Sequence, residues 1–369
     1  MKAHLFSILC LDLLHVSFSQ TFGQKNPIEY PQLSSRSQIT QTIGISKVTI
    51  DYGRPNVISP QNGEDRTGQI WGDRVKYGYQ PVSSYGFGND RPWRAGANIA
   101  TSISFSHDAK LEGQAVKAGK YGLFMLIEEE SATIILSNDN NGWGSYFYRE
   151  ENDVLRIKVK TEDIPLTKIL TYSFIETDKN KSVIVLDWEY KRIPFNVSFD
   201  TPSIVVDNLR KNILTLHYEP GWYGLNRAAQ YCLDNNINIE EALEWSNQSI
   251  NRGKSFANLA TKSSLLDELG RKEEALIVIK EAMGLSDVKI TDTYFYGDQL
   301  MKAGKTAKAR IIFEHQLSKW PDHWRSSLGM AKVYASEGND KKAQKMINES
   351  LSKTESEGIK RFIQNTFKN

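Results

Sequence analysis

The sequence predicts an α+β protein of two domains, an N-terminal antiparallel β-sandwich or jelly-roll-like domain and a C-terminal α-helical solenoid. Two observations predict this class. Apolar residues recur with a period of two over Gln38 to Phe199, which is the pattern of half-buried antiparallel strands. After this segment the period changes to 3.6, and glycines recur 34 residues apart, at Gly270, Gly304 and Gly338. A chain of 369 residues is long enough for two separate cores.

The first 19 residues have the parts of a secretory signal peptide. Lys2 precedes an apolar stretch from Leu5 to Phe18, and small residues lead up to Ser19. This predicts export with cleavage near Ser19, to the periplasm, the cell surface or the medium, and residues 20–33 then form a linker. Asp12 interrupts the apolar stretch, so an uncleaved irregular tail is the alternative.

Composition excludes some functions. Lys+Arg number 46 and Asp+Glu 44, without a long run of one charge, so the chain lacks the concentrated basic face that nucleic-acid binding needs. Of the two cysteines, Cys10 lies in the signal, so the mature chain keeps Cys232 alone and forms no intrachain disulfide. The apolar neighbours of Cys232 indicate a buried thiol rather than a nucleophile.

The β-sandwich domain is predicted over residues 34–199, with eight to ten strands. Clear strands run through Val48 to Tyr52, Leu155 to Val159 and Ile184 to Trp188. Glu112-Gly113 and Ala118-Gly119 mark hairpin turns. Because no amphipathic helix lies between these strands, a sandwich is the expected solution.

Residues 54–97 interrupt the strand pattern with a long segment rich in glycine, proline and aromatic residues. Long loops of this kind are often functional. Aromatic rings stack on sugar or peptide faces and guanidinium groups clamp carboxylates, so a ligand site is predicted here. The alternative is that the rings close the end of the sandwich. The predicted ligand-binding residues are Arg54, Trp71, Tyr77, Tyr79, Trp93, Arg94 and Asn98, with Arg74, Tyr85 and Arg91 beside them.

Helices are predicted from residue 200 onward. Residues 200–221 form a connecting helix, with Thr201 as its cap and Pro202 in its first turn. Residues 222–369 then form about four helix pairs and a terminal helix. The pairs are Trp222 to Leu233 with Ile239 to Ile250, Phe256 to Leu269 with Lys272 to Met283, Thr293 to Ala303 with Thr306 to Lys319, and Trp324 to Ser336 with Asp340 to Leu351; the last helix is Ile359 to Phe367.

An alanine follows each repeated glycine five residues later, at Ala275, Ala309 and Ala343. The glycine permits the turn within a pair, and the alanine lets the two helices approach closely. The stretches Leu269 to Leu276 and Ala303 to Ala309 resemble the tetratricopeptide repeat, which implies a protein or peptide partner. A non-repeating helical bundle is the alternative.

The N-terminal domain resembles domain of unknown function 2911, a family of exported bacterial proteins. The resemblance implies the domain limits and export, but no activity, cofactor or catalytic residue. It rests on Gln41 to Gly44, Val48 to Pro55, Trp93 to Asn98, Ala118 to Tyr121 and Trp143-Gly144.

No catalytic, cofactor or metal site is predicted. Asp187 and Glu189 are spaced like a carboxylate pair, but Leu186 and Trp188 take the core face of the strand. Both carboxylates are therefore expected on the solvent face, in a charge ladder with Arg156, Lys158 and Lys160. Residues 138–142 resemble a calcium loop but lack its first and last ligands, which favours a simple turn.

These observations predict an exported, non-catalytic binding or scaffold protein. Its helical repeats hold a protein or peptide, and its aromatic loop holds a second ligand, such as a glycan. The competing hypothesis is a hydrolase of cell-envelope glycan or peptide, with carboxylates such as Asp51 and Asp73 converging near Trp93. A structural envelope role is a third. Candidate partner contacts on the repeats are Tyr223, Tyr231, Tyr294 and Trp324.

Overall fold

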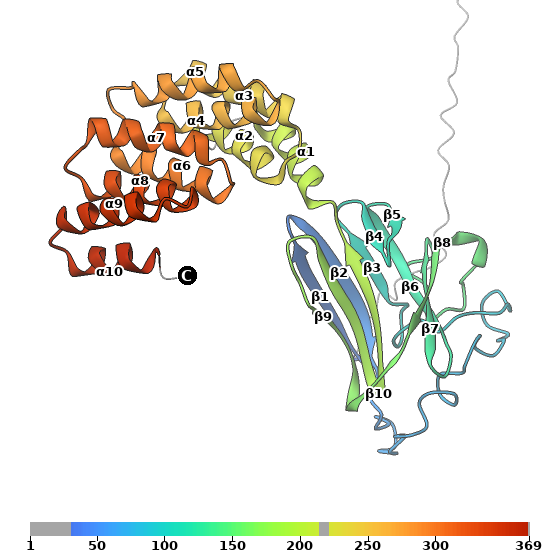
Figure 1. Ribbon diagram of the computed structural model, residues 1–369. Helices are drawn as coiled ribbons and strands as arrows, with labels where there is room; N and C mark the ends of the chain where they lie inside the picture. The colour runs from blue at the N-terminus through green and yellow to red at the C-terminus, as the bar shows by residue number, and fades with distance from the viewer. Residues whose placement is uncertain (1–30, 214–220, 368–369) are drawn as a thin grey trace, which may run out of the picture. The chain divides into compact units, whose positions relative to one another are not determined.

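The computed structural model of the protein describes residues 31–213 and 221–367. The chain divides into two compact units, the first ending at Thr201 and the second beginning at Pro202 (Figure 1). The predicted signal peptide and most of the predicted linker lie outside the described residues.

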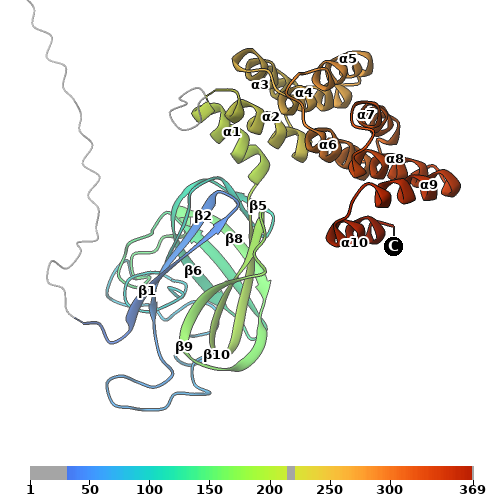
Figure 2. The same cartoon turned by 90° about the vertical axis from the view of Figure 1, so that its left-hand side faces the viewer.

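The first unit is a sandwich of two antiparallel sheets, as predicted (Figure 2). One sheet has the strand order β1-β2-β3-β6-β7-β8, and the other has the order β5-β4-β10-β9. The strands of the described residues are β1 (Ser35–Ile43), β2 (Ser46–Arg54), β3 (Ser102–Phe105), β4 (Ala109–Leu111), β5 (Gln114–Val116), β6 (Gly119–Ile127), β7 (Ser131–Ser137), β8 (Asp153–Lys160), β9 (Glu162–Ile175) and β10 (Lys181–Ser198).

Local sequence explains the hairpin turn between β4 and β5. Glu112 and Gly113, the predicted turn between β4 and β5, both have positive φ angles, of 44° and 81°. In the core, Tyr52 of β2 and Tyr172 of β9 meet edge to face with ring centroids 4.8 Å apart, and the Tyr172 amide donates to the Tyr52 hydroxyl. The core therefore joins the two sheets directly.

Strand β10 departs from the predicted alternation at Glu189. Ile184, Leu186 and Trp188 face the core, but after a bulge the buried residues continue at Ile193 and beyond, in the opposite phase. Glu189 has a φ angle of 55° and is only 3% exposed, and its carboxylate accepts the backbone N–H of Gly68. The expected solvent-face position of Glu189 is therefore wrong, because the bulge turns its side chain inward.

The predicted charge ladder is wrong as well. Asp187 pairs with Arg192 of its own strand at 2.7 Å, whereas Lys158 pairs with Glu128 at 2.7 Å. Arg156 pairs with Asp153 at 2.7 Å. Arg156 and Lys158 thus pair with other residues than Asp187 and Glu189, and no ion pair in the described part of the chain joins Lys160 to either of them.

The long loop between β2 and β3 continues the larger sheet. Strand β3 pairs only with the first part of β6, over Gly119 to Gly122. Beyond that point Trp93 exchanges two backbone hydrogen bonds of 2.9 Å with Met125, and the Gly78 amide donates to the Ile127 carbonyl at 2.7 Å. These bonds satisfy the free edge of β6 and fasten the loop to the sheet.

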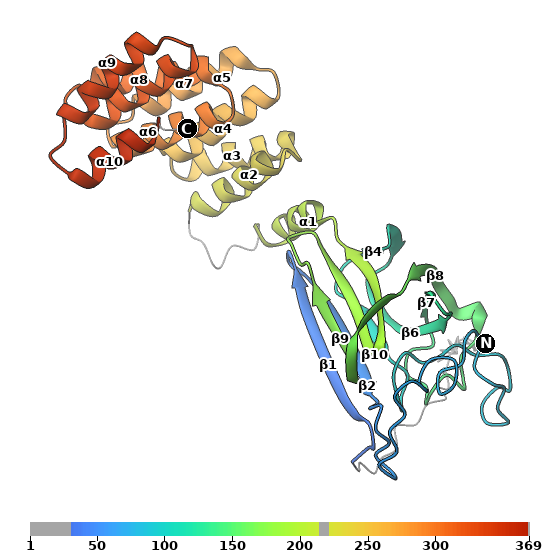
Figure 3. The ribbon, with the colours of Figure 1, turned by 60° about the horizontal axis from the view of Figure 1, so that its bottom comes forward.

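The second unit consists of helices, most of them in antiparallel pairs (Figure 3). Pairs form between α2 and α3, α4 and α5, α6 and α7, and α8 and α9, as predicted. The helices are α1 (Thr201–Ile213), α2 (Tyr223–Asn235), α3 (Ile239–Arg252), α4 (Phe256–Glu268), α5 (Lys272–Met283), α6 (Ile290–Lys302), α7 (Thr306–Lys319), α8 (Trp324–Ser336), α9 (Asp340–Ser352) and α10 (Glu357–Asn365).

The turn within each pair has a left-handed residue at the same place. Gly270, Gly304 and Gly338 have φ angles of 75°, 71° and 72°, and Asn236 takes that conformation in the first pair with a φ of 51°. The alanines five residues after the glycines are buried against the neighbouring helix; they are Ala275, Ala309 and Ala343, at 1%, 0% and 5% exposure. Small side chains at these sites allow close packing of the pair.

Candidate functional site

A groove of about 510 Å³ crosses the first helices of three successive pairs, α2, α4 and α6. Residues 287–289, in the loop before α6, also line it. Its lining combines amide, hydroxyl and carboxylate groups with one large exposed ring, Phe295, which is 62% exposed. The lining residues are Asn226, Gln230, Leu233, Ser255, Phe256, Ala257, Ala260, Thr261, Ser264, Asp287, Val288, Lys289, Asp292, Phe295, Tyr296 and Gln299.

Asn226 differs from the other residues of the groove lining because a buried atom of its side chain has no hydrogen-bond partner. The residue is only 8% exposed, and its Oδ1 is buried without a hydrogen bond. By contrast, Gln230 donates to Asp234 at 2.7 Å and accepts from Thr261 at 3.1 Å. A buried acceptor left unpaired costs about 1–3 kcal/mol, so Asn226 carries an acceptor that a donor would satisfy.

Tyr296, which also lines the groove, is a neutral group held by a hydrogen bond. The Tyr296 hydroxyl lies 3.0 Å from that of Ser264, which joins α6 to α4. Burial raises the pKa of Tyr296 to about 12, so the phenol stays protonated near neutral pH.

The four aromatic residues expected to contact a partner do not line the groove. Tyr294 and Trp324 are 3% and 8% exposed and belong to the core of the helical unit, so their prediction as contact residues is wrong. Tyr231 packs against the core near the start of the repeats, and Tyr223 is exposed but lies outside the groove lining. Helix packing buries the larger rings because their apolar area contributes most to the core.

In the β domain, the predicted ligand residues do not converge. Trp71 and Trp93 turn inward and meet Trp188 of β10, with ring centroids between 5.7 and 6.1 Å apart. Trp93 is 6% exposed. These two tryptophans therefore close the end of the sandwich, and Tyr77 remains outside, 46% exposed.

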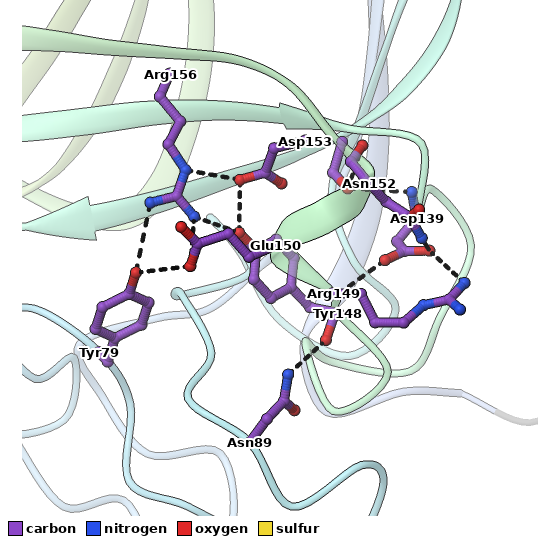
Figure 4. A network of polar contacts seen from close by, with 10 residues as sticks. Tyr79, Asn89, Asp139, Tyr148, Arg149, Glu150, Asn152, Asp153 and Arg156 are labelled. Carbon is purple, nitrogen blue, oxygen red and sulfur yellow. Dashed lines mark hydrogen bonds and ion pairs between the residues drawn. The ribbon is translucent and has the colours of Figure 1, made fainter.

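Tyr79 joins a polar network at strand β8 (Figure 4). Its hydroxyl donates to Glu150 at 3.3 Å and accepts from Arg156 at 3.4 Å. Arg156 also donates at 2.7 Å to both the Tyr148 hydroxyl and Asp153, and the Tyr148 hydroxyl donates to Asp153 at 2.7 Å. Burial raises the pKa of Tyr148, so it stays neutral as a donor. The network fastens the loop between β2 and β3 and the loop between β7 and β8 to strand β8.

The three remaining predicted residues have separate positions. Arg54 donates to the Leu170 carbonyl at 3.3 Å and to the Thr171 hydroxyl at 3.0 Å, both on β9. Asn98 adopts a φ angle of 63° and donates to the Ser34 carbonyl at 3.1 Å. Arg94 lies apart from both, beside Tyr146.

The carboxylates of the hydrolase hypothesis also have different partners. Asp51 pairs with Arg36 on the neighbouring strand at 2.7 Å, and Asp73 pairs with Lys76 in the loop at 3.4 Å. Trp93 lies among the buried tryptophans instead. The three groups thus do not form one catalytic cleft.

Residues 138–142 form an irregular loop held by side chains rather than a regular turn. Asp139 accepts the Arg149 amide and the Asn152 side-chain amide, each at 2.9 Å (Figure 4). Within residues 31–213 and 221–367, no cluster of three or more His, Cys, Asp or Glu side chains is arranged to hold a metal ion. Cys232 is fully buried, and burial raises its pKa to about 11, which suppresses its reactivity as a thiolate.

The sequence did carry one signal for the groove that its interpretation missed. Gln230 and Ser264 lie 34 residues apart, at equivalent positions of two first helices, and both line the groove. Polar residues at an equivalent position of successive repeats mark this shared face of the first helices. In the β domain, the sequence interpretation also passed over three consecutive aromatic residues, Tyr146 to Tyr148, shortly after residues 138–142.

The fold and the groove define a class of protein, an antiparallel β-sandwich followed by tetratricopeptide-like helix pairs. Residues 34–197 match the family model described as "Protein of unknown function (DUF2911)". Both resemblances noted in the sequence are thus confirmed, the second by the helix pairs themselves. No helix in the described part of the chain has the length and hydropathy needed to cross a membrane.

Several solved structures are similar to the helical part of the chain. "Crystal structure of MamA" is 18% identical, with 42% of this chain and 88% of that chain covered and a TM-score of 0.30. TTC0263, "a thermophilic TPR protein in Thermus thermophilus", is 17% identical, covering 45% and 88%, with a TM-score of 0.30. YrrB, "a TPR protein with an unusual peptide-binding site", is 17% identical, covering 39% and 73%, with a TM-score of 0.26. No curated protein matches the sequence.

Proposed function

We propose that this protein is an exported, non-catalytic binding protein whose helical unit holds an extended peptide segment of a partner protein. The observation that carries the proposal is the unpaired, buried Oδ1 of Asn226 in the wall of the groove. A peptide backbone offers an N–H donor at every residue except proline, so it can supply the missing bond.

The dimensions and lining of the groove support the same function. A volume of about 510 Å³ lies in the range of ligand sites, about 300–1,000 Å³. The exposed ring of Phe295 offers apolar contact for a side chain, while the side-chain amide of Gln299 lines the same groove and suits a main chain. Such a mixture suits a peptide better than a wholly apolar molecule.

We expect replacement of Asn226 by leucine to weaken peptide binding without destabilising the fold. The substitution removes both the acceptor that the ligand uses and the penalty of leaving it unpaired. Affinity for a peptide selected on the full chain from a random library should fall at least about tenfold, which is about 1.4 kcal/mol. Titration calorimetry measures this effect, and thermal unfolding checks that the variant is folded.

The matched control is Asn251→Leu, which makes the same change at an exposed position near the end of α3. It should bind the selected peptide as the unchanged chain does. Equal affinity of the Asn226→Leu variant would contradict the role of this residue. Failure of the full chain to select any peptide would overturn the proposed function itself.

The proposed function also includes export of the protein and binding of a second ligand. The signal-like pattern of residues 1–19 supports export. In a bacterial host, we expect the chain recovered from the periplasm to begin near Gln20 when its N-terminus is sequenced; a chain retained in the cytoplasm and starting at Met1 would contradict export. The second ligand binds to the loops of the β domain, where aromatic side chains remain exposed.

A further inference from the structure

Two loops of the β domain bring four aromatic rings together at the surface. Tyr85 meets Tyr146 and Phe147 with centroid distances of 5.1 and 5.5 Å, and Phe87 meets Phe147 at 5.4 Å. Tyr85 and Phe87 are nevertheless 56% and 52% exposed. Rings that pack on one another and still face solvent indicate a binding surface.

Two arginines border this cluster without a carboxylate partner. The Arg91 guanidinium lies 4.3 Å from the centroid of the Tyr146 ring and donates to the Pro81 carbonyl at 2.7 Å. Arg94 lies beside the same ring, and the Nε atoms of both arginines are buried without a hydrogen bond. None of the ion pairs found within residues 31–213 and 221–367 includes either residue. By contrast, Arg149, which lies over Phe87, is paired with Asp139 at 3.6 Å.

The two guanidinium groups therefore form an uncompensated pair of positive charges. Burial lowers the pKa of Arg94; Tyr146 opposes this shift, and the nearby charge of Arg91 adds to it. Like charges held together at a partly buried site destabilise the fold unless an anion neutralises them. Planar guanidinium groups bind a carboxylate through paired hydrogen bonds.

We propose that Arg91, Arg94, Tyr85 and Tyr146 form a site for an acidic sugar, in which the arginines bind the carboxylate of a uronic acid unit and the tyrosines contact the sugar ring. This inference rests on the second ligand of the proposed function and names its chemical class. A sugar offers apolar C–H faces and hydroxyl edges at close spacing, which matches rings that alternate with guanidinium and phenol groups. A free anion would use the arginines but would leave the exposed rings without a role.

The test is binding of oligogalacturonate to the full chain, measured by titration calorimetry at low and moderate salt. We expect Arg91→Gln and Tyr85→Ala each to weaken binding at least about tenfold. The matched controls are Arg74→Gln, an exposed loop arginine paired with Glu64, and Tyr77→Ala, a loop tyrosine outside the cluster; both should bind within about twofold of the unchanged chain. Far-UV circular dichroism confirms folding of each variant.

The remaining probes separate the alternatives. Neutral dextran oligosaccharides that bind as tightly as oligogalacturonate would overturn the role of the arginines, while the second ligand of the proposed function would stand. Polyglutamate that binds as tightly, with no effect of Tyr85→Ala, would point to an acidic protein and overturn the sugar. Absence of binding to every probe would overturn the site, and the peptide groove would still be judged by its own variant at Asn226.

Discussion

Replacing Phe313 by alanine is expected to lower the free energy of unfolding of the helical unit by about 3–5 kcal/mol. Phe313 of α7 is completely buried. Its ring fills the space beside two glycines, Gly297 of α6 and Gly329 of α8, where an added Cβ would come within 2.5 and 2.2 Å of the ring. Truncation leaves a cavity that rigid helix backbones on both sides cannot close. Chemical denaturation followed by circular dichroism, which reports mainly on the helices, measures the effect.

Phe295→Ala provides the matched control. Phe295 is 62% exposed on the same unit, so its loss should change the free energy of unfolding by less than about 0.5 kcal/mol. If both variants lost the same stability, Phe313 would not have the central packing role that its two glycine neighbours indicate.

Replacing Gly53 by alanine is expected to destabilise the β domain by about 3 kcal/mol or more. An added Cβ would lie 2.2 Å from the carbonyl oxygen of Ala97 and 2.9 Å from its carbon. Both are backbone atoms of the long loop, so no side-chain rotation relieves the clash. The loop cannot shift easily either, since the buried hydroxyls of Thr101 and Tyr172 both donate to the Ala95 carbonyl, at 2.9 and 3.0 Å.

Native-state hydrogen exchange read by mass spectrometry resolves the two units and measures this loss. The slowest amides of β2 and β6 should exchange faster in the Gly53→Ala variant, while those of α7 stay unchanged. Gly142→Ala is the control, because its nearest neighbour would be Phe147 Cβ at 3.9 Å, an ordinary contact. Unchanged protection of β2 in the Gly53→Ala variant would show that the loop is not held against this strand.

The helical unit was largely predictable because its signals are local. Lys272–Met283, Thr306–Lys319 and Trp324–Ser336 have the bounds expected from the sequence. Each turn needs a left-handed residue, which glycine adopts without strain, and the 3.6-residue period places the apolar face. Neither feature depends on a distant part of the chain.

The strands of the sandwich were predictable, but the bulge in β10 was not. The alternation of β10 is regular up to Trp188, and no turn residue announces the change at Glu189. The group that holds the Glu189 carboxylate is the Gly68 amide, 121 residues earlier in the chain. A local pattern contains no information about such a partner.

The candidate sites were likewise only partly predictable from the sequence. Composition marked the segment after Arg54 as aromatic and rich in arginine, yet it could not separate rings that fill the core from rings that face solvent. The structure makes that separation: Trp93 is drawn inward by its backbone pairing with Met125, while Tyr85 is held outside by Tyr146 from another loop. Arg91 and Arg94 become candidates for one binding site only because both lie beside Tyr146 in the structure.

The two-part architecture and the repeat of the helices could be established from the sequence, because periodicity and turn residues act over a few neighbours. Which side chains are available to a ligand became clear only in the folded chain. Burial depends on contacts between distant segments, as for the Asn226 acceptor left unpaired between helices and the arginine pair left without a carboxylate between loops. Those contacts are set by packing, which no single segment encodes.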